Sequence, residues 1–153
     1  MSPDNRAAIT ILMADDDPED RMLAEDALRE ARLENEIHFA YDGEDLLDYL
    51  GRQGRHETLQ GQPLPGLILL DLNMPRMDGR EALAAIKSNP KWQHIPVVVL
   101  TTSSAETDIM RSYHLGGNSF ITKPVTFDGL VHVMRSLGDY WFHVVALPPQ
   151  GGE

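Results

Sequence analysis

Asp71 is the residue of this chain whose position best fits a reactive acid. It ends the apolar run Leu67 to Leu70, which Gly66 precedes and Pro75 follows, and the turn Met77-Asp78-Gly79 comes next. An apolar run bounded in this way is typical of a strand buried on both faces of a parallel sheet. An acid at the carboxyl end of such a strand lies at the edge where open α/β sheets bind ligands. The run predicts a functional carboxylate, with simple strand termination as the alternative.

Polar residues also follow three further strand-like runs. Asp15-Asp16 follow the first run, Thr101 ends the fourth and Lys123 follows the fifth. Grouped carboxylates repel each other, and a hard divalent cation such as Mg²⁺ relieves that repulsion through oxygen ligands. An ionised Asp71 can then attack phosphorus in line, while Lys123 and Thr101 stabilise charge on the phosphoryl oxygens. The pattern predicts Mg²⁺-dependent phosphoryl chemistry.

Each of these residues has a simpler interpretation when it is taken alone. The run Asp15-Asp16-Asp17 before Pro18 could be the N-cap and first-turn acids of a helix. Thr101 could be an ordinary strand-end threonine, and Lys123 a surface lysine at a turn. Lys123 precedes Pro124, however, and a residue before proline is held extended, which aims it along the strand axis. The order and spacing of the whole set favour the chemical interpretation.

The elements that must position these residues alternate between strand-like and helix-like segments, which predicts a parallel α/β sheet. We predict five strands, over Ile9–Ala14, Glu36–Tyr41, Gly66–Asp71, Val97–Thr101 and Ser119–Thr122. We predict five helices, one after Pro18, three over Glu44–Gly51, Arg80–Ser88 and Ala105–Leu115, and one from Phe127. The expected apolar faces of the first two helices are Met22, Leu23, Ala27 and Leu28, then Leu46, Leu47 and Leu50. Arg52–Pro65 is rich in Gly, Gln and Pro, so we expect a surface loop.

The order of the strands decides whether the acids can meet. We take the order 2-1-3-4-5 from known doubly wound sheets, in which the first and third strands lie side by side. In that order Asp16 and Asp71 face one crevice at the carboxyl edge of the sheet.

Composition limits the classes of function. The chain has 153 residues, which suits one domain with a core of its own, and it has no cysteine, which excludes disulfides and thiol nucleophiles. Thirteen Lys+Arg against 24 Asp+Glu give a net charge of −11, which repels nucleic acid and anionic membranes. There is no secretory signal and no apolar run of membrane-spanning length, so we expect a cytoplasmic protein.

Over about Ile9–Leu137 the chain resembles the response-regulator receiver family of two-component signalling. The motifs that carry the resemblance are Ile11 to Pro18, Asp71 to Pro75 with Asp78-Gly79, Pro96 to Thr101, and Phe120 to Pro124. The resemblance implies a flavodoxin/receiver-like doubly wound (βα)5 fold with Asp71 as phosphoacceptor. The Mg²⁺ ligands that it implies are Asp15, Asp16, Asp71 and the backbone carbonyl of Asn73.

The same resemblance assigns a phosphorylation switch to Thr101 and Phe120, and a cis peptide to Lys123–Pro124. The responding face comprises the fourth helix, the fifth strand and the fifth helix. Phe120 replaces the commoner tyrosine, so it has no hydroxyl to donate when the ring turns inward. Thr102 is bulkier than the small residue often found there, which affects access of water to the acyl phosphate.

Within the family, the chain is similar to stand-alone regulators that pair with bacterial phytochrome histidine kinases. The long segment before the third strand, the phrase Val98 to Ser103, and the end Tyr140 to Pro148 carry this similarity. It implies a sensor histidine kinase as partner, with a bacteriophytochrome as the candidate.

The C-terminal end is unusually apolar. A stripe at helical spacing comprises Leu130, Val133, Met134, Leu137, Trp141 and Val144, longer than the fifth helix needs to cover the sheet. Exposed apolar residues of this kind mark an interface, so we predict a homodimer through Tyr140, Trp141, Phe142, Val144 and Val145. We therefore divide the chain into an N-terminal tail (1–8), a receiver domain (9–138), and an apolar C-terminal extension with a frayed tail (139–153).

The leading hypothesis is a single-domain response regulator that takes a phosphoryl group from a histidine kinase onto Asp71 and is otherwise not an enzyme. An intermediate in a multistep phosphorelay is an alternative. An Mg²⁺-dependent phosphatase with an aspartyl nucleophile would need an acid at position 73, where the chain has Asn73. A flavodoxin-like cofactor binder would need a phosphate-cradling loop where Asp15-Asp16-Asp17 stand. No role is assigned to any of the six histidines.

Overall fold

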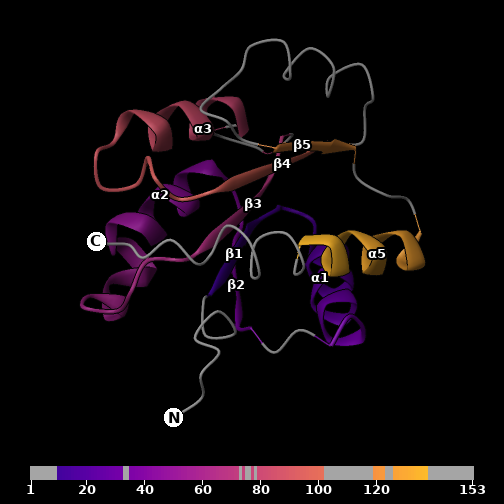
Figure 1. Cartoon of the computed structure of the whole chain (residues 1–153). Helices are drawn as coiled ribbons and strands as arrows, with labels where there is room; N and C mark the ends of the chain where they lie inside the picture. Colours follow the sequence, from indigo (N-terminus) through magenta and orange to yellow (C-terminus); the bar gives the residue numbers. More distant parts are fainter. Residues whose placement is uncertain are drawn as a thin grey trace.

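A parallel β-sheet forms the centre of the protein (Figure 1). Its strands are β1 (Ile11–Ala14), β2 (Ile37–Ala40), β3 (Leu67–Asp71), β4 (Val97–Thr101) and β5 (Ser119–Thr122). Neighbours in the sheet follow the order β2-β1-β3-β4-β5, and every pairing is parallel. The predicted α/β fold with a parallel sheet is confirmed. Three strands are one or two residues shorter than predicted, and β4 and β5 have the predicted bounds.

The computed structural model describes residues 10–32, 35–72, 74, 77, 79–101, 119–122 and 126–137, with the backbone alone for 119–122 and 137. The predicted helix over Ala105–Leu115, the tail 1–8 and the extension 139–153 lie outside these residues. None of the helices in the described ranges is long and apolar enough to cross a membrane.

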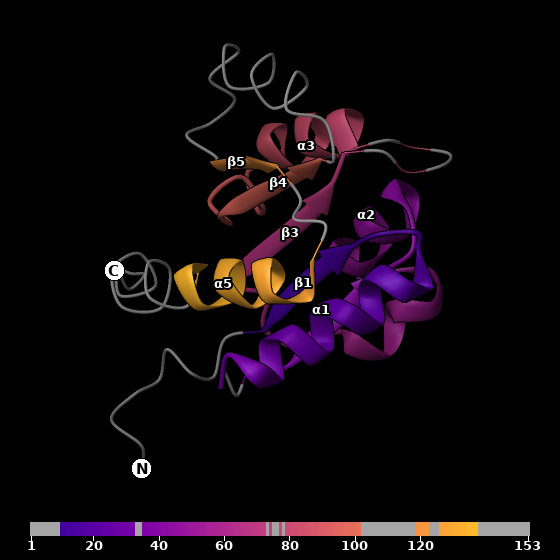
Figure 2. The same cartoon turned by 90° about the vertical axis from the view of Figure 1, so that its right-hand side faces the viewer.

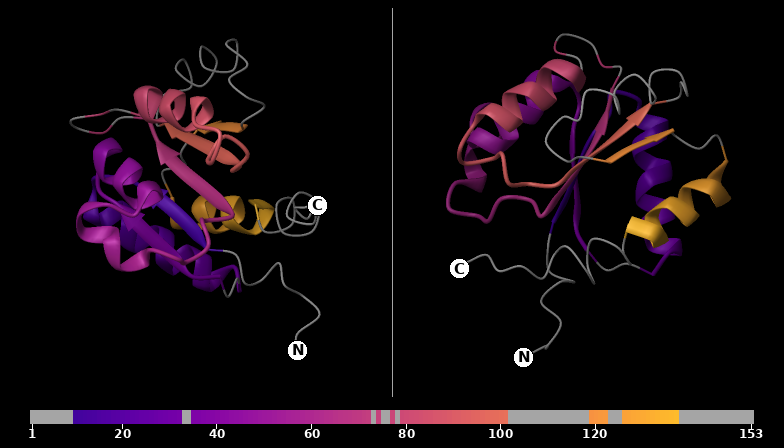
Figure 3. Two further views of the ribbon diagram at one scale, coloured as in Figure 1. Left: turned by 90° about the vertical axis from the view of Figure 1, so that its left-hand side faces the viewer. Right: turned by 45° about the horizontal axis from the view of Figure 1, so that its top comes forward.

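Helices cover both faces of the sheet. They are α1 (Pro18–Glu30), α2 (Gly43–Gly51), α3 (Gly79–Ser88) and α5 (Phe127–Leu137). Helices α1 and α5 lie on one face, as Figure 2 shows, and α2 and α3 lie on the other, as the right-hand view of Figure 3 shows. The predicted start of the last helix at Phe127 is confirmed, and α2 and α3 each begin one residue before the predicted position.

The side chains of each central strand divide between two separate cores. Leu12 of β1 and Leu70 of β3 pack toward α2 and α3, whereas Met13 and Leu69 pack toward α1 and α5. Successive side chains of a strand point to opposite faces, so a strand covered on both faces must be apolar at every position. This explains the unbroken apolar runs of the sequence.

The buried face of α1 differs from the predicted face. Ala24, Ala27 and Leu28 are buried, but Met22 is 63% and Leu23 42% exposed. Met22 precedes Ala27 by five residues, which is about 140° around an α-helix, so the two cannot share a narrow face. The small alanines face the sheet instead. The prediction was correct for Ala27 and Leu28 and wrong for Met22 and Leu23.

The segment after α2 is more ordered than a plain surface loop. Arg52 adopts the left-handed conformation with φ 56° at the C-cap of α2, and a 3₁₀ helix, η2 (Gly54–Leu59), follows. His56 in η2 is only 5% exposed and bonds to Asp45. The expectation of a surface segment over Arg52–Pro65 is correct, since most of its residues are exposed, but the expectation of a plain loop is corrected by the 3₁₀ helix. The buried contact between His56 and Asp45 holds this helix to α2.

Candidate functional site

Three acids meet at the carboxyl edge of the sheet. Ala14 of β1 pairs with Leu70 of β3, so the residues that follow them, Asp15 and Asp71, leave neighbouring strands at the same level. Carboxylate oxygens of Asp15, Asp16 and Asp71 all lie within 4.8 Å of one another. Asp15 and Asp71 are buried, and Asp16 is exposed. The predicted convergence of the first and third strand ends is therefore present.

The three consecutive acids Asp15, Asp16 and Asp17 in the turn from β1 into α1 have different roles. The Asp15 amide donates to the Ala40 carbonyl at 3.0 Å, and the Asp15 carboxylate accepts from the Asp17 amide at 2.9 Å. The Asp17 carboxylate accepts from the Glu19 amide at 2.9 Å and caps α1, with Pro18 as the first helical residue. The N-cap interpretation of the acidic run is thus correct for Asp17, while the two preceding acids join Asp71.

Two glycines hold the segment after Asp71. The Gly79 amide donates to the Leu72 carbonyl at 2.9 Å, and a Cβ on Gly79 would lie 2.6 Å from the Asp71 carbonyl oxygen. The Gly43 amide donates to the Met77 carbonyl at 3.1 Å, and a Cβ there would collide with the same carbonyl. Both contacts need a residue without a side chain, because real Cβ atoms do not approach backbone so closely.

The donor set at this edge suits a hard cation. Carboxylate oxygens are the ligands that Mg²⁺ prefers, and Mg²⁺ usually takes only one or two of them and keeps several waters. Two buried carboxylates and one exposed carboxylate within 4.8 Å offer enough oxygen ligands and leave one side open to solvent. The arrangement fits a divalent metal that is reached from the Asp16 side.

Thr101 ends β4 beside β3 and is fully buried. Asp71 pairs with Leu100 of β4, so Thr101 continues the same edge, and it pairs with Thr122 of β5. Phe120 lies in β5 opposite Val99. The other predicted site residues lie outside the described ranges: Asn73, Lys123, Pro124, Tyr140, Trp141, Phe142, Val144 and Val145.

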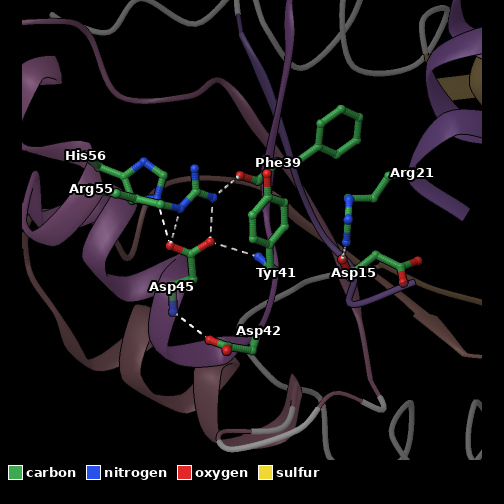
Figure 4. Close-up of polar contacts among 8 residues, drawn as sticks. All are labelled: Asp15, Arg21, Phe39, Tyr41, Asp42, Asp45, Arg55 and His56. Atoms are coloured by element: carbon green, nitrogen blue, oxygen red, sulfur yellow. Dashed lines mark hydrogen bonds and ion pairs between the residues drawn. The ribbon is translucent and has the colours of Figure 1, made fainter. Parts of the chain in front are cut away.

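A contact that the sequence did not indicate joins the acidic turn to the next strand. Arg21 of α1 donates through Nη1 to the carbonyl oxygen of Asp15 at 2.8 Å. Its Cζ lies 4.3 Å from the centroid of the Tyr41 ring, and the Cζ of Arg55 lies 4.3 Å from the same centroid. Figure 4 shows the Tyr41 ring between the two guanidinium groups.

Asp45 anchors this group of residues. Its carboxylate accepts from Arg55 at 2.7 and 3.1 Å, from the Tyr41 amide at 2.9 Å, and contacts His56 Nε2 at 2.8 Å (Figure 4). Burial would raise the pKa of Asp45, but the hydrogen bonds from Arg55, Tyr41 and His56 and the Arg55 charge outweigh it, so the pKa is lowered. The carboxylate is thus held ionised. Asp42 caps α2 by accepting from the Asp45 amide at 2.8 Å, and an acid three residues after an N-cap was the available sequence signal.

Comparisons with known proteins agree with this geometry. The pattern of the family described as response regulator receiver domain matches residues 11–135. Response regulator Rcp1 of Synechocystis sp. is 38% identical over 148 residues, which is 97% of this chain and 99% of Rcp1. The crystal structure of its Mn²⁺-bound form has a TM-score of 0.77 at 39% identity and covers 92% of this chain and 99% of that chain.

Two further solved structures are similar. The bacteriophytochrome response regulator AtBRR has a TM-score of 0.75 at 41% identity, over 88% of this chain and 95% of that chain. The phosphorylated cyanobacterial phytochrome response regulator RcpA has a TM-score of 0.78 at 36% identity, over 93% and 99%. With its acid cluster at the carboxyl edge of a parallel sheet, this chain belongs to the response regulator receiver domain family and is related to phytochrome response regulators.

Proposed function

We propose that this chain is a single-domain response regulator that accepts a phosphoryl group on Asp71 from a sensor histidine kinase in a Mg²⁺-dependent reaction. The observation that carries the proposal is the meeting of Asp15, Asp16 and Asp71 at the carboxyl edge of the sheet. A buried acid at the end of a central strand, with two more acids beside it, suits attack on phosphorus once the acids are neutralised. Membership of the receiver family supports the same chemistry.

The proposed residues divide the work of phosphoryl transfer. An oxygen of Asp71 forms the new bond to phosphorus as the bond from phosphorus to the donor histidine breaks, which leaves an acyl phosphate on Asp71. Bound Mg²⁺, held by Asp15, Asp16, Asp71 and the Asn73 carbonyl, would neutralise charge on the acids and on the phosphoryl oxygens. The Thr101 hydroxyl and the Lys123 ammonium bind the remaining oxygens.

The signal then leaves through protein contacts. Thr101 follows the acyl phosphate, Phe120 changes its environment, and the face of the fourth helix, β5 and α5 presents a different surface to its partner. A cis Lys123–Pro124 peptide would place the lysine at the site. The apolar extension 139–153 forms a homodimer contact, after a receiver domain over 9–138 and a tail over 1–8.

The upstream partner in this proposal is a bacteriophytochrome kinase in the cytoplasm. AtBRR is a bacteriophytochrome response regulator and RcpA is a cyanobacterial phytochrome response regulator, and each is at least 36% identical to this chain over most of both lengths. These similarities support a kinase of the phytochrome type.

Intact mass spectrometry tests the phosphoryl chemistry directly. The protein is incubated with Mg²⁺ and a small acyl phosphate, beside Asp71→Asn and a sample without Mg²⁺. We expect one added phosphoryl group in the complete reaction alone. Absence of the adduct together with failure to bind beryllofluoride, a phosphoryl mimic, would contradict the proposal; addition to Asp71→Asn would place the acceptor elsewhere.

A further inference from the structure

We infer that Tyr41, Arg21 and Arg55 form a brace that positions the Asp15-Asp16 peptide and thereby sets the affinity of the acid cluster for Mg²⁺. The inference rests on the proposed function, because it assigns positioning residues to the proposed metal site. None of the three side chains is itself a ligand in this proposal. The brace is visible in Figure 4 as a line of side chains from Asp45 through Arg55, Tyr41 and Arg21 to the Asp15 carbonyl.

The first step is the hydrogen bond from Arg21 to the Asp15 carbonyl at 2.8 Å. That carbonyl belongs to the peptide unit that joins Asp15 to Asp16. Because a peptide unit is planar and rigid, holding its oxygen fixes the rotation of the whole unit and the directions in which both flanking carboxylates leave the backbone. Arg21 binds a main-chain oxygen and not a carboxylate oxygen. Its guanidinium therefore orients the Asp15 and Asp16 carboxylates without occupying the oxygens that would bind the metal.

The Tyr41 ring holds the Arg21 side chain in place. A long arginine side chain at a partly exposed position loses rotamer entropy of about 2 kcal/mol when it is fixed, so one hydrogen bond secures it poorly. The Tyr41 ring offers a second contact, with the guanidinium carbon 4.3 Å from the ring centroid. A guanidinium over an aromatic face is attracted by the ring quadrupole, and the flat contact also fixes its plane.

Arg55 and Asp45 hold Tyr41 in place. Tyr41 is 47% exposed, so burial in the core does not fix its ring. Arg55 lies against it at 4.3 Å, and Arg55 is itself bound by Asp45 at 2.7 and 3.1 Å and by the Phe39 carbonyl at 3.2 Å. The Tyr41 amide donates to the same Asp45 carboxylate at 2.9 Å. The brace therefore starts from the first turn of α2 and ends at the acidic turn.

Magnesium affinity is the quantity that the brace should change. Residues that orient metal ligands from outside the coordination sphere typically alter metal affinity by about 10- to 100-fold when they are replaced. For a partly exposed brace we expect the low end, about tenfold weaker binding, in Tyr41→Leu and Arg21→Gln. Tyr41→Phe keeps the aromatic face and should bind Mg²⁺ as the native protein does.

The sign of the Arg21→Gln effect separates positioning from long-range electrostatics. Removing a positive charge beside an acid cluster should, by Coulomb attraction alone, strengthen the binding of a cation. The brace predicts weaker binding. Tyr41→Leu changes no charge, and Arg29→Gln, which removes an exposed arginine from the last turn of the same helix, serves as the matched charge control.

The experiment is titration calorimetry of the full chain with Mg²⁺, followed by the Mg²⁺ dependence of phosphorylation by a small acyl phosphate. We expect the Mg²⁺ dissociation constant to rise about tenfold in Tyr41→Leu and Arg21→Gln and to stay unchanged in Tyr41→Phe and Arg29→Gln. At saturating Mg²⁺ the phosphorylation rate of Tyr41→Leu should return to the native rate. A general folding defect would instead lower the rate at every Mg²⁺ concentration.

The outcomes separate this inference from the proposed function. Native protein that binds Mg²⁺ and is phosphorylated, with Tyr41→Leu and Arg21→Gln binding equally well, overturns the brace alone. The brace is also overturned if Tyr41→Phe binds Mg²⁺ as weakly as Tyr41→Leu does. It is overturned as well if the phosphorylation rate of Tyr41→Leu stays low at saturating Mg²⁺. Native protein that binds no Mg²⁺ overturns the proposed metal site and the brace together.

Discussion

The amide of Gly43 donates a hydrogen bond to the carbonyl of Met77 at 3.1 Å, which ties the start of α2 to the segment that follows β3. The approach leaves no space for a Cβ on Gly43. We expect Gly43→Ala to destabilise the fold by about 2 kcal/mol, because well-packed backbone must move apart. Urea unfolding measures the change.

Gly51 in the last turn of α2 is the matched control. A Cβ there would meet its nearest neighbours at 3.7 Å or more, which is ordinary contact. Gly51→Ala should stabilise the protein by about 0.5 kcal/mol through the lower backbone entropy of the unfolded chain. Equal effects of the two substitutions would show that the Gly43 contact with Met77 does not constrain the fold.

Asp45→Asn should lower the free energy of unfolding at neutral pH by roughly 2 kcal/mol, because it removes a charged acceptor that serves Arg55 and His56. The pKa of Asp45 is below its ordinary value of 3.8 in the folded protein. A lowered pKa stabilises the folded state above 3.8, and that contribution is lost as pH falls through the folded value. The difference between native protein and Asp45→Asn should therefore shrink below about pH 4.

Urea unfolding between neutral pH and about pH 3 measures this dependence. Asp26→Asn is the control, since Asp26 is an exposed acid whose ion pair with Arg29 is 3.5 Å long. It should leave stability nearly unchanged at every pH. If the difference in unfolding free energy between native protein and Asp45→Asn stayed constant over the whole pH range, the lowered pKa of Asp45 would be contradicted.

Adjacent acids at the start of α1 should have separable effects. Asp17→Ala removes an N-cap and should cost about 1 kcal/mol of stability with little effect on Mg²⁺ binding. Asp16→Asn should weaken Mg²⁺ binding and leave the metal-free protein as stable as before or slightly more stable, because it relieves repulsion within the cluster. Calorimetry measures Mg²⁺ binding by the two variants, and thermal melting measures their stability. If Asp17→Ala weakened Mg²⁺ binding and Asp16→Asn did not, Asp16 would be excluded as a ligand.

The buried face of α1 can be tested by truncation. Leu28→Ala removes a side chain from the core between α1, α5 and the sheet and should cost about 3 kcal/mol. Met22→Ala, at an exposed position of the same helix, should change stability by less than about 0.5 kcal/mol. Similar losses from both truncations would mean that Met22 packs against protein in solution.

The arrangement of the acids could be predicted because a strand buried on both faces has an unbroken run of apolar residues in the sequence. Leu67 to Leu70 are all apolar, so the strand and its end at Asp71 are readable, and the parallel order then brings Asp15 alongside. The face of α1 was harder. Two of its three buried residues are alanines, and a large apolar residue such as Met22 outweighs them in a hydrophobic pattern although it is exposed.

The Tyr41 brace could not be predicted for a different reason. It joins single charged and aromatic side chains from α1, the end of β2 and η2, and such contacts have no period along the chain. Arg21 and Arg55 look like ordinary surface arginines until the fold places them on either side of one ring. The burial of His56 is similar, because a lone polar residue in a Gly- and Gln-rich segment gives no sign of its partner.

The division of each central strand between two cores limits how far a substitution in one layer of helices affects the other layer. Leu12 and Met13 are neighbours in the chain, yet each packs with a different pair of helices. Helices α1 and α5 pack against one set of strand positions, and α2 and α3 pack against the alternate set. A substitution that alters the packing of α1 or α5 can therefore be compensated at strand positions that do not touch α2 and α3, and the contact of Gly43 with Met77 is left undisturbed.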